Sequence, residues 1–320
     1  MKSLKQTLQL SFVLVFAALF QIQAQQPTAP VPGAAEAVQQ RAAQPAPQQQ
    51  TPQPETPVRF GVLGDTGTGG KPQIEIAQKM KATHSKFPFE FVILLGDNMY
   101  GGESARDFQN KFEKPYEALL KVGIKFYASL GNHDVPERQI SYKPFNMGGQ
   151  RYYTFKPKDG VRFFALDSNY MDKKQLDWLE SELKNSGSEW KVPFFHHPIY
   201  SSGEKHGPSL ELRKVLEPLL IKYGVDVVFA GHEHFYERVK PQNGIQYFIL
   251  GNSAKLRKGG LAKSDITAKG FDSDYAYMVA EILGDEMSFQ AISRTGAVVD
   301  SGKFRRVERK TATELKTGKD

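Results

Sequence analysis

The sequence predicts one domain of the α/β class, a four-layer αββα sandwich in which two mixed β-sheets are flanked by helices. Short apolar segments alternate with helical patterns over much of the chain, as in a sheet that is covered by helices. Other apolar segments follow one another without a helical pattern between them. We therefore expect strand pairs that form a second sheet packed on the first.

Five apolar segments rich in Val, Ile, Phe and Leu predict buried strands. They span residues 59–63, 89–95, 125–130, 190–195 and 225–230. Helical patterns lie between several of them, over residues 72–84, 171–185 and 208–223. A proline favours the start of the first helix, and leucines at helical spacing indicate the other two. The strand pairs are predicted at 151–155 with 161–166, and at 246–250, 275–283 and 287–292.

The two ends of the chain lack the composition of a folded domain. Residues 1–24 carry two lysines, then nine continuous apolar residues, then a polar end, which is typical of a signal peptide cleaved after Ala24. This apolar run is shorter than the about 20 residues that span a bilayer. We therefore expect no membrane span in the mature chain and an exported protein, periplasmic, secreted or at the cell surface. Residues 25–57 predict a disordered Pro/Gln/Ala-rich spacer, 58–302 the folded domain, and 303–320 a basic, disordered tail.

Composition argues against two classes of site. The chain contains no cysteine, so it has neither a disulfide framework nor a thiolate metal ligand, and any metal must bind oxygen and nitrogen. The formal net charge is +7, and the tail alone holds seven basic and three acidic residues. Because the basic charge lies mostly outside the predicted domain, we expect no nucleic-acid partner.

Five short polar motifs follow one another in the domain, most of them directly after a predicted strand. They are Gly64–Gly67, Gly96–Tyr100, Gly131–Asp134, His196–Pro198 and Gly231–His234. Open α/β sheets bind ligands beyond the carboxyl ends of their strands, so we expect these side chains to meet at one rim. A single Gly-Asp usually marks a turn, and a lone histidine is usually structural. The ordered co-occurrence of all five motifs carries the prediction.

The donor types of these motifs favour a site for two metal ions. Asp65 and Asp97 supply hard carboxylate ligands, each after a glycine that lets the chain approach an ion. His232 and His234 stand two residues apart, which in an extended segment places both imidazoles on one side. Two ions that share a carboxylate polarise a phosphoryl oxygen and ionise a bound water. The predicted reaction is therefore hydrolysis of a phosphate ester.

At these residues the chain resembles the calcineurin-like metallophosphoesterases, and within them the small, mammalian-type purple acid phosphatases. All five motifs stand in the family's order, and Gly-Asp-x-x-Tyr, which ends at Tyr100, is the purple signature. The resemblance implies a metallophosphoesterase fold for residues 58–302, with ferric iron and a second divalent ion, Fe, Zn or Mn. The implied iron ligands are Asp65, Tyr100 and His234, those of the second ion are Asn132, His196 and His232, and Asp97 is the implied bridge.

The resemblance also implies residues that handle the substrate. His133 is expected to contact the phosphate or to protonate the leaving alcohol, with Asp134 orienting its ring. His206 resembles the family's second substrate histidine, although it lies one residue further along than in the mammalian-type branch. His197 is expected to support the site from beside it, and His84 is expected to be structural.

The implied function is an acid phosphatase that hydrolyses small-molecule or protein phosphomonoesters by attack of a metal-bound hydroxide at an Fe(III)–M(II) centre. A phosphodiesterase or a nucleotidase on the same site is an alternative, because specificity depends on loops such as 201–206 and 256–267 rather than on the motifs. A third reading is a non-catalytic surface module that metals stabilise. The complete set of expected ligands, together with His133, argues against this module.

Overall fold

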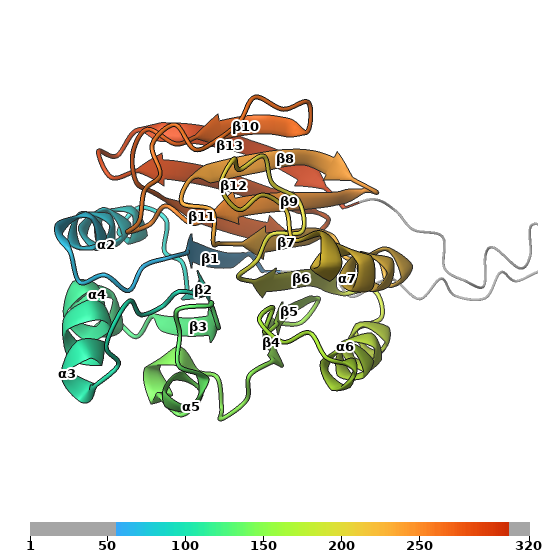
Figure 1. Cartoon of the computed structure of the whole chain (residues 1–320), viewed down its shortest axis with the longest axis horizontal. Coiled ribbons are helices and arrows are strands. Elements are labelled where there is room, and N and C mark those ends of the chain that lie inside the picture. The colour runs from blue at the N-terminus through green and yellow to red at the C-terminus, as the bar shows by residue number, and fades with distance from the viewer. Residues whose placement is uncertain (1–55, 307–320) are drawn as a thin grey trace, which may run out of the picture. The chain divides into compact units, whose positions relative to one another are not determined.

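The computed structural model describes residues 56–306, which form two β-sheets packed face to face with helices on the outside (Figure 1). The predicted signal peptide, nearly all of the predicted spacer and most of the predicted tail lie outside the described residues. In the part of the chain that is described, no helix has the length and apolar character needed to cross a membrane.

Sheet A has six strands in the order β13-β12-β11-β1-β2-β3. Its parallel part consists of β1 (Val58–Leu63), β2 (Phe91–Leu95) and β3 (Lys125–Ser129). Its antiparallel part consists of β11 (Ala276–Leu283), β12 (Glu286–Ser293) and β13 (Val298–Arg305). Strand β11 pairs with β1 and so joins the two parts into one mixed sheet.

Sheet B has seven strands in the order β10-β8-β9-β7-β6-β5-β4. Four neighbours run parallel, namely β5 (Val161–Ala165), β6 (Trp190–Phe195), β7 (Val227–Ala230) and β9 (Ile245–Leu250). The outer strands pair antiparallel, namely β4 (Tyr153–Lys158), β8 (Tyr236–Gln242) and β10 (Thr267–Phe271). The αββα class predicted from the sequence is confirmed, with two mixed sheets.

The assignment of strands to sheets differs from the expectation. The predicted strand pairs do not form a second sheet of their own, because β11 and β12 extend sheet A whereas β4, β5 and β9 belong to sheet B. The strands that alternate with helices are likewise divided between the two sheets. Antiparallel strands pair with the β1 edge of the parallel set in sheet A and with both edges of the set in sheet B, which satisfies backbone groups that would otherwise be unpaired.

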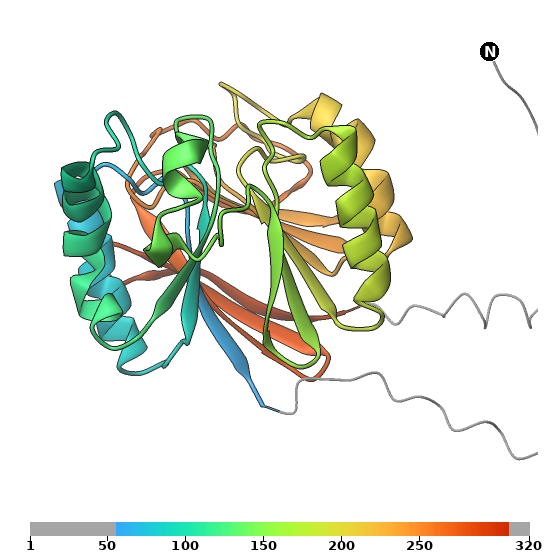
Figure 2. The same cartoon turned by 90° about the horizontal axis from the view of Figure 1, so that it is seen from below.

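Helices cover the outer faces of both sheets (Figure 2). Sheet A is covered by α2 (Lys71–His84) and α4 (Lys114–Leu120), and sheet B by α6 (Lys173–Asn185) and α7 (Leu210–Lys222). Helix α6 begins two residues later than predicted because Asp172 caps it, accepting a hydrogen bond from Gln175 N at 2.8 Å. Helix α4 was not predicted, nor were four shorter helices, namely α3 (Ala105–Phe108), a π-helix (Gln109–Glu113), α5 (Pro136–Gln139) and a 3₁₀ turn (Lys143–Phe145).

The main core lies between the sheets, where aromatic rings from both inner faces meet. Phe60 of β1 contacts Phe163 of β5 and Phe229 of β7 edge-on, with ring centroids 5.1 and 5.9 Å apart. All three side chains are fully buried. Strand β13 continues this packing to Arg305, past the domain boundary expected at residue 302, because its pairing with β12 extends to the Glu286 end. The sandwich thereby fixes the relative position of the two sheets and of the rim where their parallel strands end.

Candidate metal centre

The predicted ligands lie on loops at the rim where the parallel strands of both sheets end, at the top of Figure 2. Sheet A contributes Asp65 after β1, Asp97 and Tyr100 after β2, and Asn132 after β3. Sheet B contributes His196 after β6, and His232 and His234 after β7. Backbone hydrogen bonds join neighbouring loops, from Asp65 N to Gly96 O at 3.1 Å and from Gly231 N to His196 O at 3.0 Å. Both sheets therefore supply one cluster of side chains.

Three of these residues adopt a left-handed backbone conformation. The φ angle is 56° at Asp65, 50° at Asp97 and 69° at His232. Such angles are uncommon outside glycine and cost about 1–3 kcal/mol each, and they concentrate at functional sites. The loops also approach each other closely, since a Cβ atom on Gly131 would overlap the backbone of Asp97. The strained turns are held by the packing around them.

The first group of donors surrounds the hydroxyl of Tyr100. Its oxygen lies 2.8 Å from Asp97 Oδ2, 3.0 Å from Asp65 Oδ1 and 3.4 Å from His234 Nε2. His234 Nε2 also lies 3.2 Å from Asp65 Oδ1. Both carboxylates are buried, and the His234 side chain is 17% exposed. Three ligand types therefore converge at one edge of the site.

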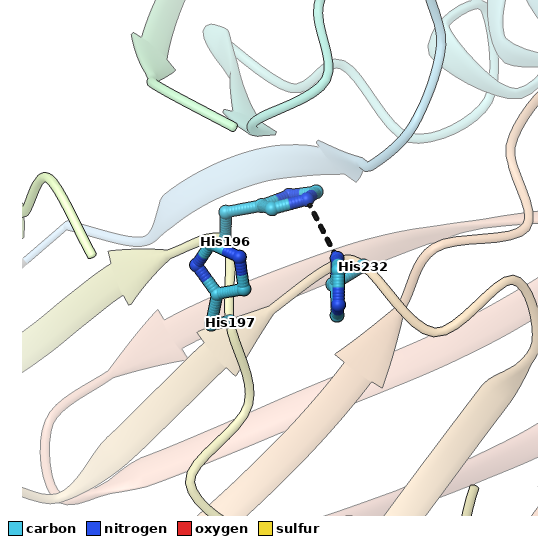
Figure 3. Close-up of side chains that lie close together, drawn as sticks. All are labelled: His196, His197 and His232. Atoms are coloured by element: carbon cyan, nitrogen blue, oxygen red, sulfur yellow. Dashed lines mark hydrogen bonds between the residues drawn. The ribbon is translucent and has the colours of Figure 1, made fainter. Parts of the chain in front are cut away.

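The second group surrounds His196 (Figure 3). His196 Nε2 lies 3.0 Å from Asn132 Oδ1 and 3.1 Å from His232 Nδ1. Because His196 Nδ1 donates a hydrogen bond to the Leu95 carbonyl at 2.9 Å, the Nε2 atom of the neutral ring carries a lone pair. Two imidazole nitrogens and an amide oxygen thus face one another. Acceptors that converge in this way fit a bound cation.

His197 lies closer to this group than the sequence suggested. One of its ring nitrogens lies within 4.8 Å of donor nitrogens of His196 and His232 (Figure 3). Its Nδ1 atom is 2.9 Å from the hydroxyl of Ser168, which fixes the ring. His84, by contrast, stands apart from the cluster and packs edge-on against Phe89, with ring centroids 4.9 Å apart.

The acidic groups of the site are costly to ionise without a cation. Burial, and then the charge of Asp97, raise the pKa of Asp65 well above its usual range. Burial, and then the charges of the two carboxylates, also raise the pKa of the Tyr100 phenol. A multiply charged cation reverses both effects, because it favours the anionic form of each ligand.

The imidazoles are held in the neutral form that binds metals. Burial, and then the neighbouring His196, lower the pKa of His232 to about 2. Burial, and then the charges of Arg257 and Lys255, lower the pKa of His234 to about 4. Neutral rings offer lone pairs at any pH above these values. The donor set and its electrostatics together fit two metal ions.

Asp97 lies between the two groups of donors. Its Oδ2 atom faces the Tyr100 hydroxyl at 2.8 Å, and its Oδ1 atom lies 3.4 Å from His196 Nε2. Oδ1 also accepts a hydrogen bond from His133 N at 3.0 Å. One carboxylate thus presents an oxygen to each group, as a bridging ligand must.

His133 and Asp134 are arranged differently from the expectation. The His133 side chain is exposed, and its ring centroid lies 4.8 Å from that of Tyr100. The buried Asp134 carboxylate does not hydrogen-bond the His133 ring within residues 56–306. It accepts instead from Gly131 N at 2.8 Å, Met99 N at 3.0 Å, Gln139 Nε2 at 2.7 Å and Asn98 Nδ2 at 3.2 Å. The turn closed by Asp134 N and Gly131 O directs this carboxylate inward, where it joins the two loops.

His206 lies beside the cluster, and two residues that the sequence did not single out hold it there. Its ring centroid is 4.4 Å from that of His232, and Arg257 Nη2 lies 3.2 Å from its Nε2 atom. Arg257 Nη1 also donates to Glu233 at 3.0 Å, and the fully buried Glu233 accepts from Gly207 N at 2.7 Å. Glu233 lies within the Gly231–His234 motif, of which only the histidines were predicted to act. Arg257 belongs to no motif, and only the folded chain brings it to Glu233.

Comparison with known proteins identifies the family. The model of the calcineurin-like phosphoesterase family matches residues 58–236. The chain is 30% identical to tartrate-resistant acid phosphatase type 5 of Rattus norvegicus over 62% of this chain and 73% of the relative. It is also 30% identical to purple acid phosphatase 7 of Arabidopsis thaliana, over 62% of this chain and 71% of that relative.

Solved structures share the fold. The purple acid phosphatase PPD1 of yellow lupin (Lupinus luteus) superposes with a TM-score of 0.64 at 17% identity, over 79% of this chain and 54% of that one. GAP50, described as the anchor in the inner membrane complex of Plasmodium, superposes with a TM-score of 0.69 at 23% identity. The match covers 81% of this chain and 92% of GAP50. The family match and the relatives at 30% identity show that the chain belongs to the calcineurin-like phosphoesterases and, within them, to the purple acid phosphatases.

Proposed function

We propose that this protein is a metal-dependent acid phosphatase that hydrolyses phosphomonoesters at a dinuclear centre containing ferric iron. The observation that carries the proposal is the convergence of oxygen and nitrogen donors from both sheets, with the Asp97 carboxylate between the two groups. Acid phosphatase is also the activity for which the curated relatives are named.

The donors divide between two ions. Asp65, Tyr100 and His234 would hold the iron, Asn132, His196 and His232 would hold a second divalent ion, Fe, Zn or Mn, and Asp97 would contact both. When bound, the two ions supply Lewis acidity to a phosphoryl oxygen and lower the pKa of a water molecule. His197 remains a supporting residue in this assignment, because its Nδ1 atom is engaged with Ser168.

His133 and His206 are the groups that would handle the ester. His133 is exposed, and its backbone N–H donates to Asp97 Oδ1, so its position follows that of the central carboxylate. Its ring would hold a proton for the oxygen of the leaving alcohol. Because His206 Nε2 accepts from Arg257, its proton lies on Nδ1, which is free to donate to a phosphoryl oxygen.

The ionisation state of the Tyr100 phenol would distinguish a centre that contains ferric iron from one with two divalent ions. A phenol buried beside two carboxylates ionises only next to a highly charged cation, and tyrosinate on ferric iron absorbs visible light. We therefore predict iron in the purified protein and a visible band that Tyr100→Phe removes. Tyr127→Phe is the matched control, because that ring stacks on Phe155 against the main core and is not among the predicted ligands. A colourless protein with two divalent ions and no iron would contradict the ferric assignment while leaving phosphoester hydrolysis intact.

The preferred ester and the cellular location need separate tests. Turnover of matched phosphomonoesters and phosphodiesters by the metal-loaded protein should favour the monoesters, and a wide preference for diesters would contradict the proposal. We also propose export, with a signal peptide that ends at Ala24. Mass spectrometry of the exported protein should then find Gln25 at its N-terminus.

A further inference from the structure

The positively charged side chain of Lys255 lies beside the candidate metal centre, on the loop that follows β9. The Nζ atom of Lys255 lies over the ring of Tyr100, 4.5 Å from its centroid. Within residues 56–306 this ammonium group forms no ion pair and no hydrogen bond. Arg257, two residues further along the same loop, is fully engaged by comparison, since it binds Glu233 and His206. Lys255 therefore has capacity for a further anion.

The loop that carries Lys255 is fastened to the loops of the metal centre on both sides of this residue. Before it, Ser253 N donates to Gly64 O at 3.2 Å, and Gly64 N donates to the Ser253 hydroxyl at 3.2 Å. After it, Arg257 N donates to His234 O at 2.9 Å. Lys255 itself is only partly exposed. These hydrogen bonds on both sides of Lys255 keep its side chain near the metal centre.

The position of Lys255 indicates which part of a substrate it meets. Within residues 56–306 its ammonium group makes no hydrogen bond with the Tyr100 hydroxyl and no ion pair with Asp65 or Asp97, the groups expected to bind the iron. It lies over the ring, which extends from the hydroxyl toward the protein backbone. A phosphoryl group held at the metals would therefore leave Lys255 beside the adjoining part of the substrate, not at the reacting phosphorus.

Lys255 differs in this respect from some other partly buried cations of this domain, which have an anionic partner. Lys111, 16% exposed, pairs with Asp107 at 2.9 Å, and Arg162, 12% exposed, pairs with Glu189 at 2.8 Å. A partly desolvated cation without a partner is unfavourable unless an anion arrives to complete it. A ligand that brings its own negative charge meets this condition.

We propose that Lys255 binds a second anionic group of the substrate, so that the preferred substrates are phosphomonoesters whose leaving group carries a further phosphate or carboxylate. This inference rests on the proposed phosphatase function and deepens it, since it assigns specificity to one residue outside the predicted ligand set. An electrostatic contact of this kind selects among substrates by charge and does not contribute to cleavage of the ester bond.

A pair of substrates that differ in one charge tests the proposal. The metal-loaded enzyme is assayed with 3-carboxyphenyl phosphate and with the corresponding methyl ester, which removes only the carboxylate charge. The parent should favour the carboxylate in kcat/KM. Lys255→Met should reduce that preference roughly tenfold, the loss of a hydrogen bond to a charged group, while changing turnover of the methyl ester little. Lys255→Arg should restore the preference.

Lys258→Met is the matched control, because Lys258 is an exposed lysine on the same loop. This variant should keep the parental preference for the carboxylate. An equal loss on both substrates in Lys255→Met would overturn the inference, because Lys255 would then act on the phosphoryl group that both share. An unchanged preference would overturn it as well.

A binding measurement keeps this inference separate from the proposed function. Calorimetry compares methylphosphonate with methylenebisphosphonate, whose P–C bonds are not hydrolysed, and the second phosphonate should strengthen binding in the parent and in Lys258→Met but not in Lys255→Met. If the loaded protein hydrolyses neither ester, the phosphatase proposal fails and this binding difference still decides the role of Lys255. If it hydrolyses both and the binding difference is absent, the inference alone fails.

Discussion

The clearest test of how the site is supported is the replacement of Asp134 by asparagine. The substitution keeps the shape of the side chain but turns one carboxylate oxygen into an NH₂ group. In the structure, Oδ1 accepts from Met99 N and Gln139 Nε2, and Oδ2 accepts from Gly131 N and Asn98 Nδ2. An asparagine satisfies one of these pairs and opposes the other with donors. One buried backbone donor, Met99 N or Gly131 N, therefore loses its acceptor, whereas the side-chain amides of Gln139 and Asn98 keep other acceptors.

The expected loss follows from this count. One buried donor left without an acceptor costs about 1–3 kcal/mol. The lower end applies if Asn98 turns over, because its own Oδ1 atom has no partner in the described structure and is able to accept from the new NH₂ group. For a domain of this size, the thermal midpoint falls by about 2–4 °C for each kcal/mol of lost stability, which predicts a fall of roughly 2–12 °C.

Chemical denaturation of the metal-loaded protein measures this loss, with Asp159→Asn as the control. Asp159 is exposed in the turn between β4 and β5, ahead of Gly160, where asparagine is equally suited. The control should change stability by less than about 0.5 kcal/mol. A loss below about 1 kcal/mol in Asp134→Asn would refute the reasoning, since the four hydrogen bonds would then not join the two loops as described.

Three further predictions concern the site itself. His133→Asn should lower kcat for phosphomonoesters by about 10²–10⁴-fold and leave the metal content unchanged, as steady-state kinetics and metal analysis will show. In metal-free protein, the folded-state pKa of His232 is about 2, below the usual 6.5, so folding excludes a proton that the unfolded chain binds as the pH falls. His232→Asn removes this penalty and should gain stability relative to the parent by about 1.4 kcal/mol per pH unit below 6.5, measured by denaturant titration; a constant difference would contradict the shift. A Cβ atom on Gly203 would overlap the Glu233 carboxylate, so Gly203→Ala should lower the thermal midpoint by an amount equivalent to about 1–3 kcal/mol, whereas an unchanged midpoint would mean that the loop yields freely.

The sequence predicted the elements whose signal is local. Strand β6 was predicted with the bounds that the structure has, because Trp190–Phe195 is buried along its whole length. Strand β10 was missed, since Thr267–Phe271 is a short edge strand with exposed positions and a glycine. The division of strands between the sheets depends on pairings such as Val58 with Ile282, which are remote in sequence. No local pattern carries that information.

The same distinction holds for the site. The rim location of Asp65 and His232 follows from their place after apolar strands, so their proximity was predictable. The inward turn of the Asp134 carboxylate depends on donors from another loop, and the meeting of Glu233 with Arg257 depends on the path of the chain after β9. Such contacts between loops were accessible only from the folded structure.

Each expected metal ion draws ligands from both sheets, with Asp65 and Asn132 from sheet A and the histidines from sheet B. Half-folded intermediates with only one sheet formed therefore lack a complete coordination sphere. If these side chains hold the ions, metal capture is expected to be the last step of maturation, after the chain has reached its final topology. For a protein that crosses a membrane before it folds, the ions would be selected by the supply outside the cytoplasm, and recombinant material folded elsewhere would carry a different metal content from the same sequence.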